Sequence, residues 1–78
     1  METARVNQMI GAGIPGAEVS VAGEDCSFSV TVVSEQFRGK PPVARQKMVL
    51  GLFKEQLASG ELHALSVTTI TPEEKGNA

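Results

Sequence analysis

The sequence has few aromatic residues and only one cysteine. Its 78 residues include no tryptophan, no tyrosine, three phenylalanines and one cysteine. A single cysteine cannot form an internal disulfide, so nothing indicates an oxidising compartment. No apolar run approaches the roughly 18–20 residues that a membrane-spanning helix needs. The first residues also lack a signal-peptide pattern, because Glu2 is acidic and residues 11–16 contain Gly and Pro. We therefore expect a cytoplasmic protein that does not associate with membranes.

Sequence motifs of catalysis and nucleotide binding are also missing. The chain contains no C-x-x-C pair, no P-loop and no Ser–His–Asp arrangement. Residues 11–16 have the spacing G-x-G-x-x-G, but they follow a predicted helix and not a strand, so they do not form a dinucleotide-binding fingerprint. The three glycines around Gly11 have the spacing of turns. We therefore expect that the protein is not an enzyme.

The overall composition is that of a small globular domain. Apolar residues make up 41% of the chain and charged residues 21%. We expect one domain over residues 1–78, and a domain of this size buries only about 60–65% of its unfolded surface. Its margin of stability is therefore narrow.

Basic residues are concentrated in one segment although the net charge is −2. Between positions 38 and 54 the chain has no acidic residue, whereas the rest carries two basic and nine acidic residues, a balance of −7. Such segregation favours an oriented encounter with an acidic partner. The alternative is a solvated helix face with no binding role. The basic residues of this segment are Arg38, Lys40, Arg45, Lys47 and Lys54.

Alternation of apolar and polar residues predicts three strands. The first spans residues 17–22 and the second residues 27–33, close enough in sequence to form an antiparallel hairpin. The third begins after His63. The residues expected to face inward are Val19, Val21, Phe28, Val30, Val32, Leu65 and Val67.

Two helices are predicted around these strands. A short helix beginning near Thr3 is stopped by the glycines at 11 and 13, and the main helix runs from Pro41-Pro42 to Ser59-Gly60. At about 100° per residue, the apolar residues of the main helix gather on one face, which we expect to contact the sheet. Gln46 is the one polar residue on this face. The apolar residues of this face are Val43, Val49, Leu50, Phe53 and Leu57.

The predicted order αββαβ defines the fold class. A strand–helix–strand unit joins parallel strands by a right-handed crossover, so the sheet has three strands of mixed direction. Because the outward strand positions are rich in Ser and Thr, we expect both helices on one face. The prediction is a small two-layer α+β sandwich, with Phe37 tucked under the sheet. Residues 71–78 begin with a helix-start signal, but so few residues follow that we expect a frayed tail.

Cys26 and His63 are the candidate metal ligands. Each immediately precedes a predicted strand, and the second and third strands are expected to be parallel, so both residues come to one edge of the sheet. A thiolate and an imidazole suit zinc or an iron–sulfur cluster. Two ligands do not complete a tetrahedral site, so further ligands would have to come from another molecule. The alternatives are a small buried Cys, a His that hydrogen-bonds locally, and a Cys–His nucleophile pair.

Several motifs together resemble the BolA family. They are Phe37-x-Gly39-Lys40, Val43-x-Arg45 before an apolar helix, His63-Ala64-Leu65-Ser66 and Thr71-Pro72-Glu73-Glu74. Each is weak alone, but the combination is specific and covers nearly the whole chain. The resemblance implies a class II KH-like topology, which has the order of elements predicted above.

The resemblance also implies a function and a ligand set. BolA-like proteins pair with monothiol glutaredoxins and share a 2Fe–2S cluster with them. The family's His at the start of the last strand matches His63, and its Cys or His in the loop between the first two strands matches Cys26. The glutaredoxin Cys and its bound glutathione supply the other ligands. We accordingly expect no cofactor on the isolated chain, which would be a monomer.

A second function is suggested by the KH-like topology and by some family members. Nucleic-acid binding would use the basic segment of residues 38–54 in a transcriptional regulator. KH recognition relies on a GxxG loop, and the chain has Gly39-Lys40-Pro41-Pro42 in its place. The chain also departs from the family at Gln46, where many members have His, and at Lys75, where many have Trp.

Overall fold

The order of elements along the chain follows the predicted one. In a computed structural model, which describes residues 2–24 and 27–76, two short 3-10 turns join the regular elements. The elements are α1 (Thr3–Gly13), β1 (Glu18–Glu24), β2 (Ser27–Val33), η1 (Glu35–Phe37), α2 (Pro42–Leu50), η2 (Gly51–Phe53), α3 (Lys54–Ser59), β3 (Ala64–Ile70) and α4 (Pro72–Gly76). The predicted α+β class is confirmed, with a divided main helix and one additional helix.

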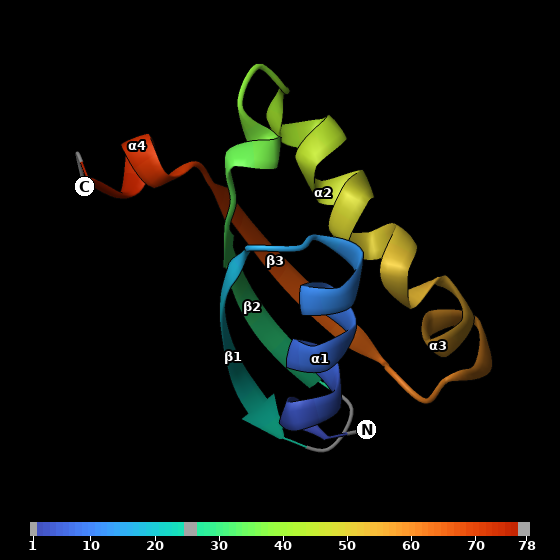
Figure 1. The fold of residues 1–78 in the computed structure, drawn as a ribbon. Coiled ribbons are helices and arrows are strands. Elements are labelled where there is room, and N and C mark those ends of the chain that lie inside the picture. The colour runs from blue at the N-terminus through green and yellow to red at the C-terminus, as the bar shows by residue number, and fades with distance from the viewer. Residues whose placement is uncertain (1, 25–26, 77–78) are drawn as a thin grey trace.

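The three strands form one mixed sheet in the order β1-β2-β3. β1 and β2 pair antiparallel, with Glu18 opposite Val33, and β2 and β3 pair parallel, with Ser27 opposite Ala64. In Figure 1, α1 and α2 lie on one side of this sheet, and α4 projects beyond the end of β3, away from them. The predicted two-layer sandwich with the main helices on one face is therefore confirmed.

β1 is longer than predicted. It continues through Gly23 to Glu24, which pairs with Ser27, whereas the first strand was expected to end at residue 22. Gly23 has a φ of 125°, a backbone conformation that side chains disfavour, and a Cβ there would collide with the Ser27 carbonyl oxygen. Glycine therefore allows the hairpin to close tightly next to residues 25 and 26, which lie outside the described residues.

The core lies between the sheet and the elements α1, α2 and η2. The predicted inward residues of β2 are buried, and Phe37 is fully buried as expected. Val49 and Phe53 supply the buried residues of the main helical segment. The buried core residues are Val6, Ile10, Ile14, Phe28, Val30, Val32, Phe37, Val49, Phe53 and Leu62.

The predicted inward face of the main helix was partly wrong. Val43 is 66% exposed and Leu57 is 36% exposed, although both were placed toward the sheet. The face of the main helical segment that contacts the core contains Val49 and Leu52. At about 100° per residue, Val43 and Leu57 lie beside this face and not at its centre. Gln46 is also exposed, and its amide donates a 3.4 Å hydrogen bond to the Val67 carbonyl on the outer strand β3.

The main helix is interrupted where it crosses α1. The 3-10 turn η2 separates α2 from α3 and brings Leu52 against Gly13, where any Cβ would collide with the Leu52 side chain. Gly13 thus allows close packing between α1 and η2, and α1 itself continues through Gly11, which was expected to stop it. No helix in the described ranges is long and apolar enough to span a membrane.

The tail is more ordered than predicted. Residues 72–76 form α4, although residues 71–78 were expected to fray. The Thr71 amide donates to Glu74 Oε1 at 2.8 Å, and the Glu74 amide donates to Thr71 Oγ1 at 3.2 Å. This reciprocal capping box satisfies two backbone donors at the helix start. The Thr71–Glu74 spacing therefore fixes a helix that its length alone would not support.

Candidate functional site

His63 lies at the end of the sheet where β2 and β3 begin. It immediately precedes Ala64, which pairs with Ser27, the first residue of β2. The imidazole belongs to an exposed residue, and no side-chain hydrogen bond joins it to another described residue. The prediction that His63 stands at this sheet edge is therefore confirmed, and the residue is exposed.

The loop before His63 is anchored from both sides. Glu61 forms an ion pair with Arg5 of α1, and the buried Leu62 donates its amide to the Gln56 carbonyl at 3.0 Å. A shallow hollow of about 310 Å³ lies beside the imidazole, with the exposed Leu57 on its rim. The backbone around His63 is thus held in place while the side chain stays accessible.

Cys26, the other predicted ligand, lies outside the described residues. Its chain neighbour Ser27 starts β2 and is paired directly with the residue after His63. Within residues 2–24 and 27–76, no three His, Cys, Asp or Glu side chains are grouped so as to hold a metal ion. The described part of the site therefore consists of one imidazole at a solvent-facing sheet edge.

The two arginines of the basic segment are engaged within the chain. Arg38 pairs with Glu35 at 2.9 Å and with Glu73 of α4 at 2.8 Å. Arg45, whose side chain is only 12% exposed, pairs with Glu74 at 2.8 Å. Its Nε also donates to the carbonyls of residues 37 and 40, at 3.1 and 2.8 Å. These arginines were predicted to contact a partner, but their donors bind η1, the loop before α2, and α4.

The carboxylates of this network have altered acidities. A side-chain hydrogen bond from Arg38 lowers the pKa of Glu35, and the same pairing raises the pKa of Arg38. The Thr71 backbone amide, followed by the Arg45 guanidinium, lowers the pKa of Glu74. In each case the hydrogen bond between the two groups favours the charged form. Glu35 and Glu74 therefore remain ionised in mildly acidic solution.

The three lysines of the basic segment point outward. Lys40, Lys47 and Lys54 are exposed and form no ion pair with a carboxylate of the described residues. Lys40 lies in the loop before α2, Lys47 on α2 and Lys54 at the start of α3, so the three follow one another along the main helical segment. The basic segment thus divides into two internal arginines and a surface row of three lysines.

The role of the C-terminal segment was missed in the sequence. Glu73 and Glu74 form ion pairs with the two arginines of the basic segment, and Lys75 pairs with Glu18 of β1 at 2.7 Å. The available signal was the Thr71-x-x-Glu74 capping box, which indicates a helix start even when few residues follow. These contacts shape the end of the sheet opposite His63.

Comparisons with known proteins agree with this arrangement. The chain is 38% identical over 74 residues to an uncharacterized protein in the rpoN-murA intergenic region of Acinetobacter guillouiae, covering 95% of this chain and 89% of that protein. It is 44% identical over 52 residues to the DNA-binding transcriptional regulator BolA of Vibrio cholerae, covering 67% of this chain and 48% of that protein.

A solved structure and a family model complete the comparison. The structure of a bolA protein homologue from Coxiella burnetii superposes with a TM-score of 0.85 at 28% identity, covering 97% of both chains. The family model for BolA-like proteins matches residues 12–74, which include all three strands and His63. On this match, together with the sheet topology, the chain belongs to the BolA-like protein family.

Proposed function

We propose that the protein is a non-enzymatic partner of a monothiol glutaredoxin and shares a 2Fe–2S cluster with it. Cys26 and His63 are the ligands from this chain, and the glutaredoxin Cys and its glutathione are the others. The isolated chain is then monomeric and free of the cluster. This proposal extends family membership, which alone does not identify a partner or a cofactor.

The observation that carries the proposal is the parallel pairing of Ser27 with Ala64. It brings the residue before β3, His63, to the same sheet edge at which the chain enters β2 from Cys26. Neighbouring strands lie only about 4.8 Å apart, so the two chain segments meet at that edge. The assignment of Cys26 rests on its sequence position, because residue 26 lies outside the described residues.

The surroundings of His63 suit a ligand shared with another protein. A metal centre held between two chains needs a donor at the surface, and His63 is exposed with its loop anchored by Arg5 and Leu62. The exposed Leu57, on the rim of the adjoining hollow, provides an apolar contact for a partner next to the donor. The cluster, when bound, supplies one-electron redox chemistry and transferable iron and sulfide.

His63 has two functions in this proposal. Its imidazole must be neutral to bind iron, so acidification weakens cluster retention. An imidazole in place of a thiolate also raises the reduction potential, as His does in Rieske centres. Cys26 contributes as the thiolate, which is the form that ligates metal.

Co-expression with a monothiol glutaredoxin tests the proposal. The purified complex is expected to show a visible absorption spectrum that differs from that of the glutaredoxin alone. His63→Ala should abolish this mixed-ligand spectrum, and Cys26→Ala should make the cluster more labile without preventing the two proteins from pairing. Glu55→Gln on α3, exposed and outside the hollow beside His63, is the control. Wild-type spectra from both ligand variants would refute the assignment.

A second candidate function is nucleic-acid binding. It is favoured by the relative named as a DNA-binding regulator and by the outward row of Lys40, Lys47 and Lys54. Three phosphate contacts give a slope of log K against log salt of about −2.7 on duplex DNA. Changing the three lysines to Gln should remove this dependence, whereas Arg38→Gln should leave it unchanged. A flat salt dependence in the wild type would exclude this mode.

A further inference from the structure

A pocket lies at the sheet end opposite His63. It is enclosed by the turn after α1, the start of β1, the end of β2 with η1, and α4, and has a volume of about 550 Å³. Pockets that bind ligands commonly measure about 300–1,000 Å³. The pocket shares no residue with the proposed cluster site or with the lysine row.

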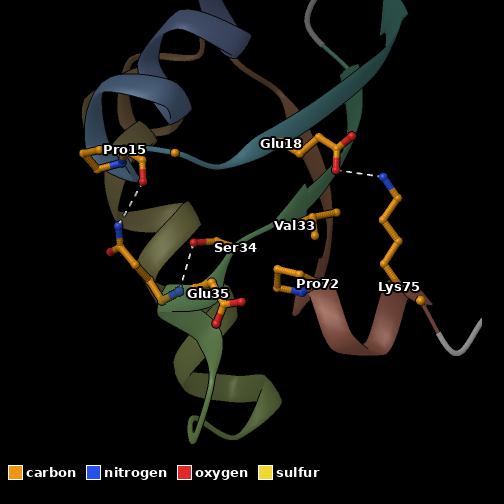
Figure 2. A pocket seen from close by; sticks show the side chains of 10 residues that line it. Pro15, Glu18, Val33, Ser34, Glu35, Pro72 and Lys75 are labelled. Carbon is orange, nitrogen blue, oxygen red and sulfur yellow. Dashed lines mark hydrogen bonds and ion pairs between the residues drawn. The ribbon is translucent and has the colours of Figure 1, made fainter.

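The floor of this pocket is apolar. Figure 2 shows Val33 and Pro72 between the Pro15 side and the Glu18–Lys75 side. Val33 is on the outer face of β2, opposite to the core residues Val30 and Val32, yet it is only 8% exposed. A small apolar surface therefore exists on the otherwise Ser- and Thr-rich side of the sheet.

The ionic groups around the floor carry excess negative charge. Glu18 and Glu35 are carboxylates, and Lys75 is the only cation among the described lining residues. Glu35 is engaged by Arg38 through two hydrogen bonds. Glu18 pairs with Lys75 alone among the described residues, and their side chains are 65% and 52% exposed. An ion pair as exposed as this contributes little stability and can exchange its cation.

The walls of the pocket are formed before any ligand binds. α4 has five residues, too few to be a stable helix by itself, and the capping box and Arg45–Glu74 hold it in place. On the other side, the Gln36 amide donates to the Pro15 carbonyl at 3.4 Å, as the dashed line in Figure 2 shows. A site that is already shaped loses less conformational entropy on binding.

We propose that this pocket binds a peptide segment of a partner protein in which an aliphatic side chain adjoins a basic one. The aliphatic group packs on Val33, Pro15 and Pro72, and the basic group replaces Lys75 at Glu18. Lys75 itself is the internal counterpart of that basic group, reaching Glu18 from α4. The negative balance of the pocket opposes acidic peptides and nucleic acid.

An NMR titration of the ¹⁵N-labelled full chain tests this proposal. The probe is the peptide acetyl-Leu-Arg-Leu amide, and the comparison peptide is acetyl-Leu-Glu-Leu amide. Saturable shifts are expected for the Arg peptide at the amides of Gly16, Val33, Glu35 and Lys75. Binding should weaken as salt is raised, because one ion pair is exchanged for another at the surface.

Variants separate the pocket from non-specific binding. Glu18→Gln should weaken binding of the Arg peptide at least fivefold, and Lys75→Ala should tighten it because Glu18 then has no competing cation. Glu55→Gln on α3, outside the pocket, is the charge-matched control and should change nothing. Thermal unfolding of each variant verifies that these surface changes preserve the fold.

Three outcomes overturn the proposal. The first is the absence of saturable shifts at the pocket amides, and the second is equal binding of the Arg and Glu peptides. The third is a concentration-dependent shift at these amides without peptide, which would assign the pocket to a second copy of the chain. The titration is independent of the glutaredoxin experiment, since neither His63 nor Cys26 takes part.

Discussion

At the sheet end where β2 and β3 begin, His63 is exposed, and Arg5–Glu61 is the one ion pair among the described residues that holds its loop. At the opposite end, four ion pairs and a capping box join β1, η1, α2 and α4. These pairs are Arg38–Glu35, Arg38–Glu73, Arg45–Glu74 and Lys75–Glu18. At one end the chain pairs its charged groups internally, whereas at the other end His63 has no side-chain hydrogen bond to another described residue.

The difference shows how a small domain separates structural and binding roles. The arginine that is 12% exposed fixes α2 and α4 together, whereas the exposed lysines of the same segment are left on the surface. A planar guanidinium can bind several acceptors at once, and Arg45 does so with two carbonyls and a carboxylate. Charge counted along the sequence therefore overstates the charge available to a partner.

Phe53→Ala should destabilise both ends together and has the largest expected effect. Phe53 is fully buried between the sheet and α1, and truncating such a residue typically costs about 3–5 kcal/mol. In a domain of this size both ends should unfold in one transition. Chemical denaturation followed by circular dichroism measures the effect. A loss below about 1 kcal/mol would contradict the packing described for η2.

Arg45→Met should loosen only the end of the sheet at which ion pairs hold α4. The substitution keeps an aliphatic stem but removes the charged donor to two carbonyls and Glu74, and hydrogen bonds to charged groups contribute about 1.5–3 kcal/mol. Arg38→Met is the matched control, because Arg38 is 53% exposed and such surface pairs contribute only about 0–1 kcal/mol. Equal losses in the two variants would mean that burial of Arg45 carries no extra stability.

Thr71→Ala should cost about 0.5–2 kcal/mol, because it removes the N-terminal cap of α4. Hydrogen exchange at the amides of residues 72–76 is the local measurement. Protection there should fall while protection in β2 stays close to that of the wild type. Unchanged exchange in α4 would show that the ion pairs alone maintain the helix.

The end of the sheet at which ion pairs hold α4 should also lose stability in acid. The pKa of Glu74 in the folded chain lies below its ordinary value of 4.5, so its contribution is complete above about pH 4.5. The contribution is lost as the pH falls through the lower folded value, where the carboxylate takes up a proton. Glu74→Gln should therefore flatten the dependence of stability on pH below 4.5, which denaturant unfolding at several pH values measures.

His63→Ala should have the smallest effect on stability. An exposed residue with no hydrogen bond to the described side chains changes the free energy of unfolding by about 0.5 kcal/mol or less. The same variant should remove the mixed-ligand spectrum in the glutaredoxin complex. A large loss of stability would show that His63 is a structural residue and that the two ends are less different than described.

The sequence by itself determined the order of elements, the strands and the BolA family resemblance. Strand β2 was predicted to the residue, since period-two alternation and a fixed register give a strong signal. The position of His63 before β3 was likewise local information, because it follows from the ends of two predicted strands. The parallel pairing then needed only the handedness of one crossover.

Only the tertiary structure decided which residues of the main helix face the core and which charges are free. The turn η2 packs against a different helix, where Gly13 leaves room for Leu52, and the count along residues 42–59 could not include this contact. The pairing of Arg45 with Glu74 joins residues 29 positions apart, and no local pattern encodes it. Periodicity reports what each segment would bury alone, whereas ion pairs and close packing form between segments that the fold brings together.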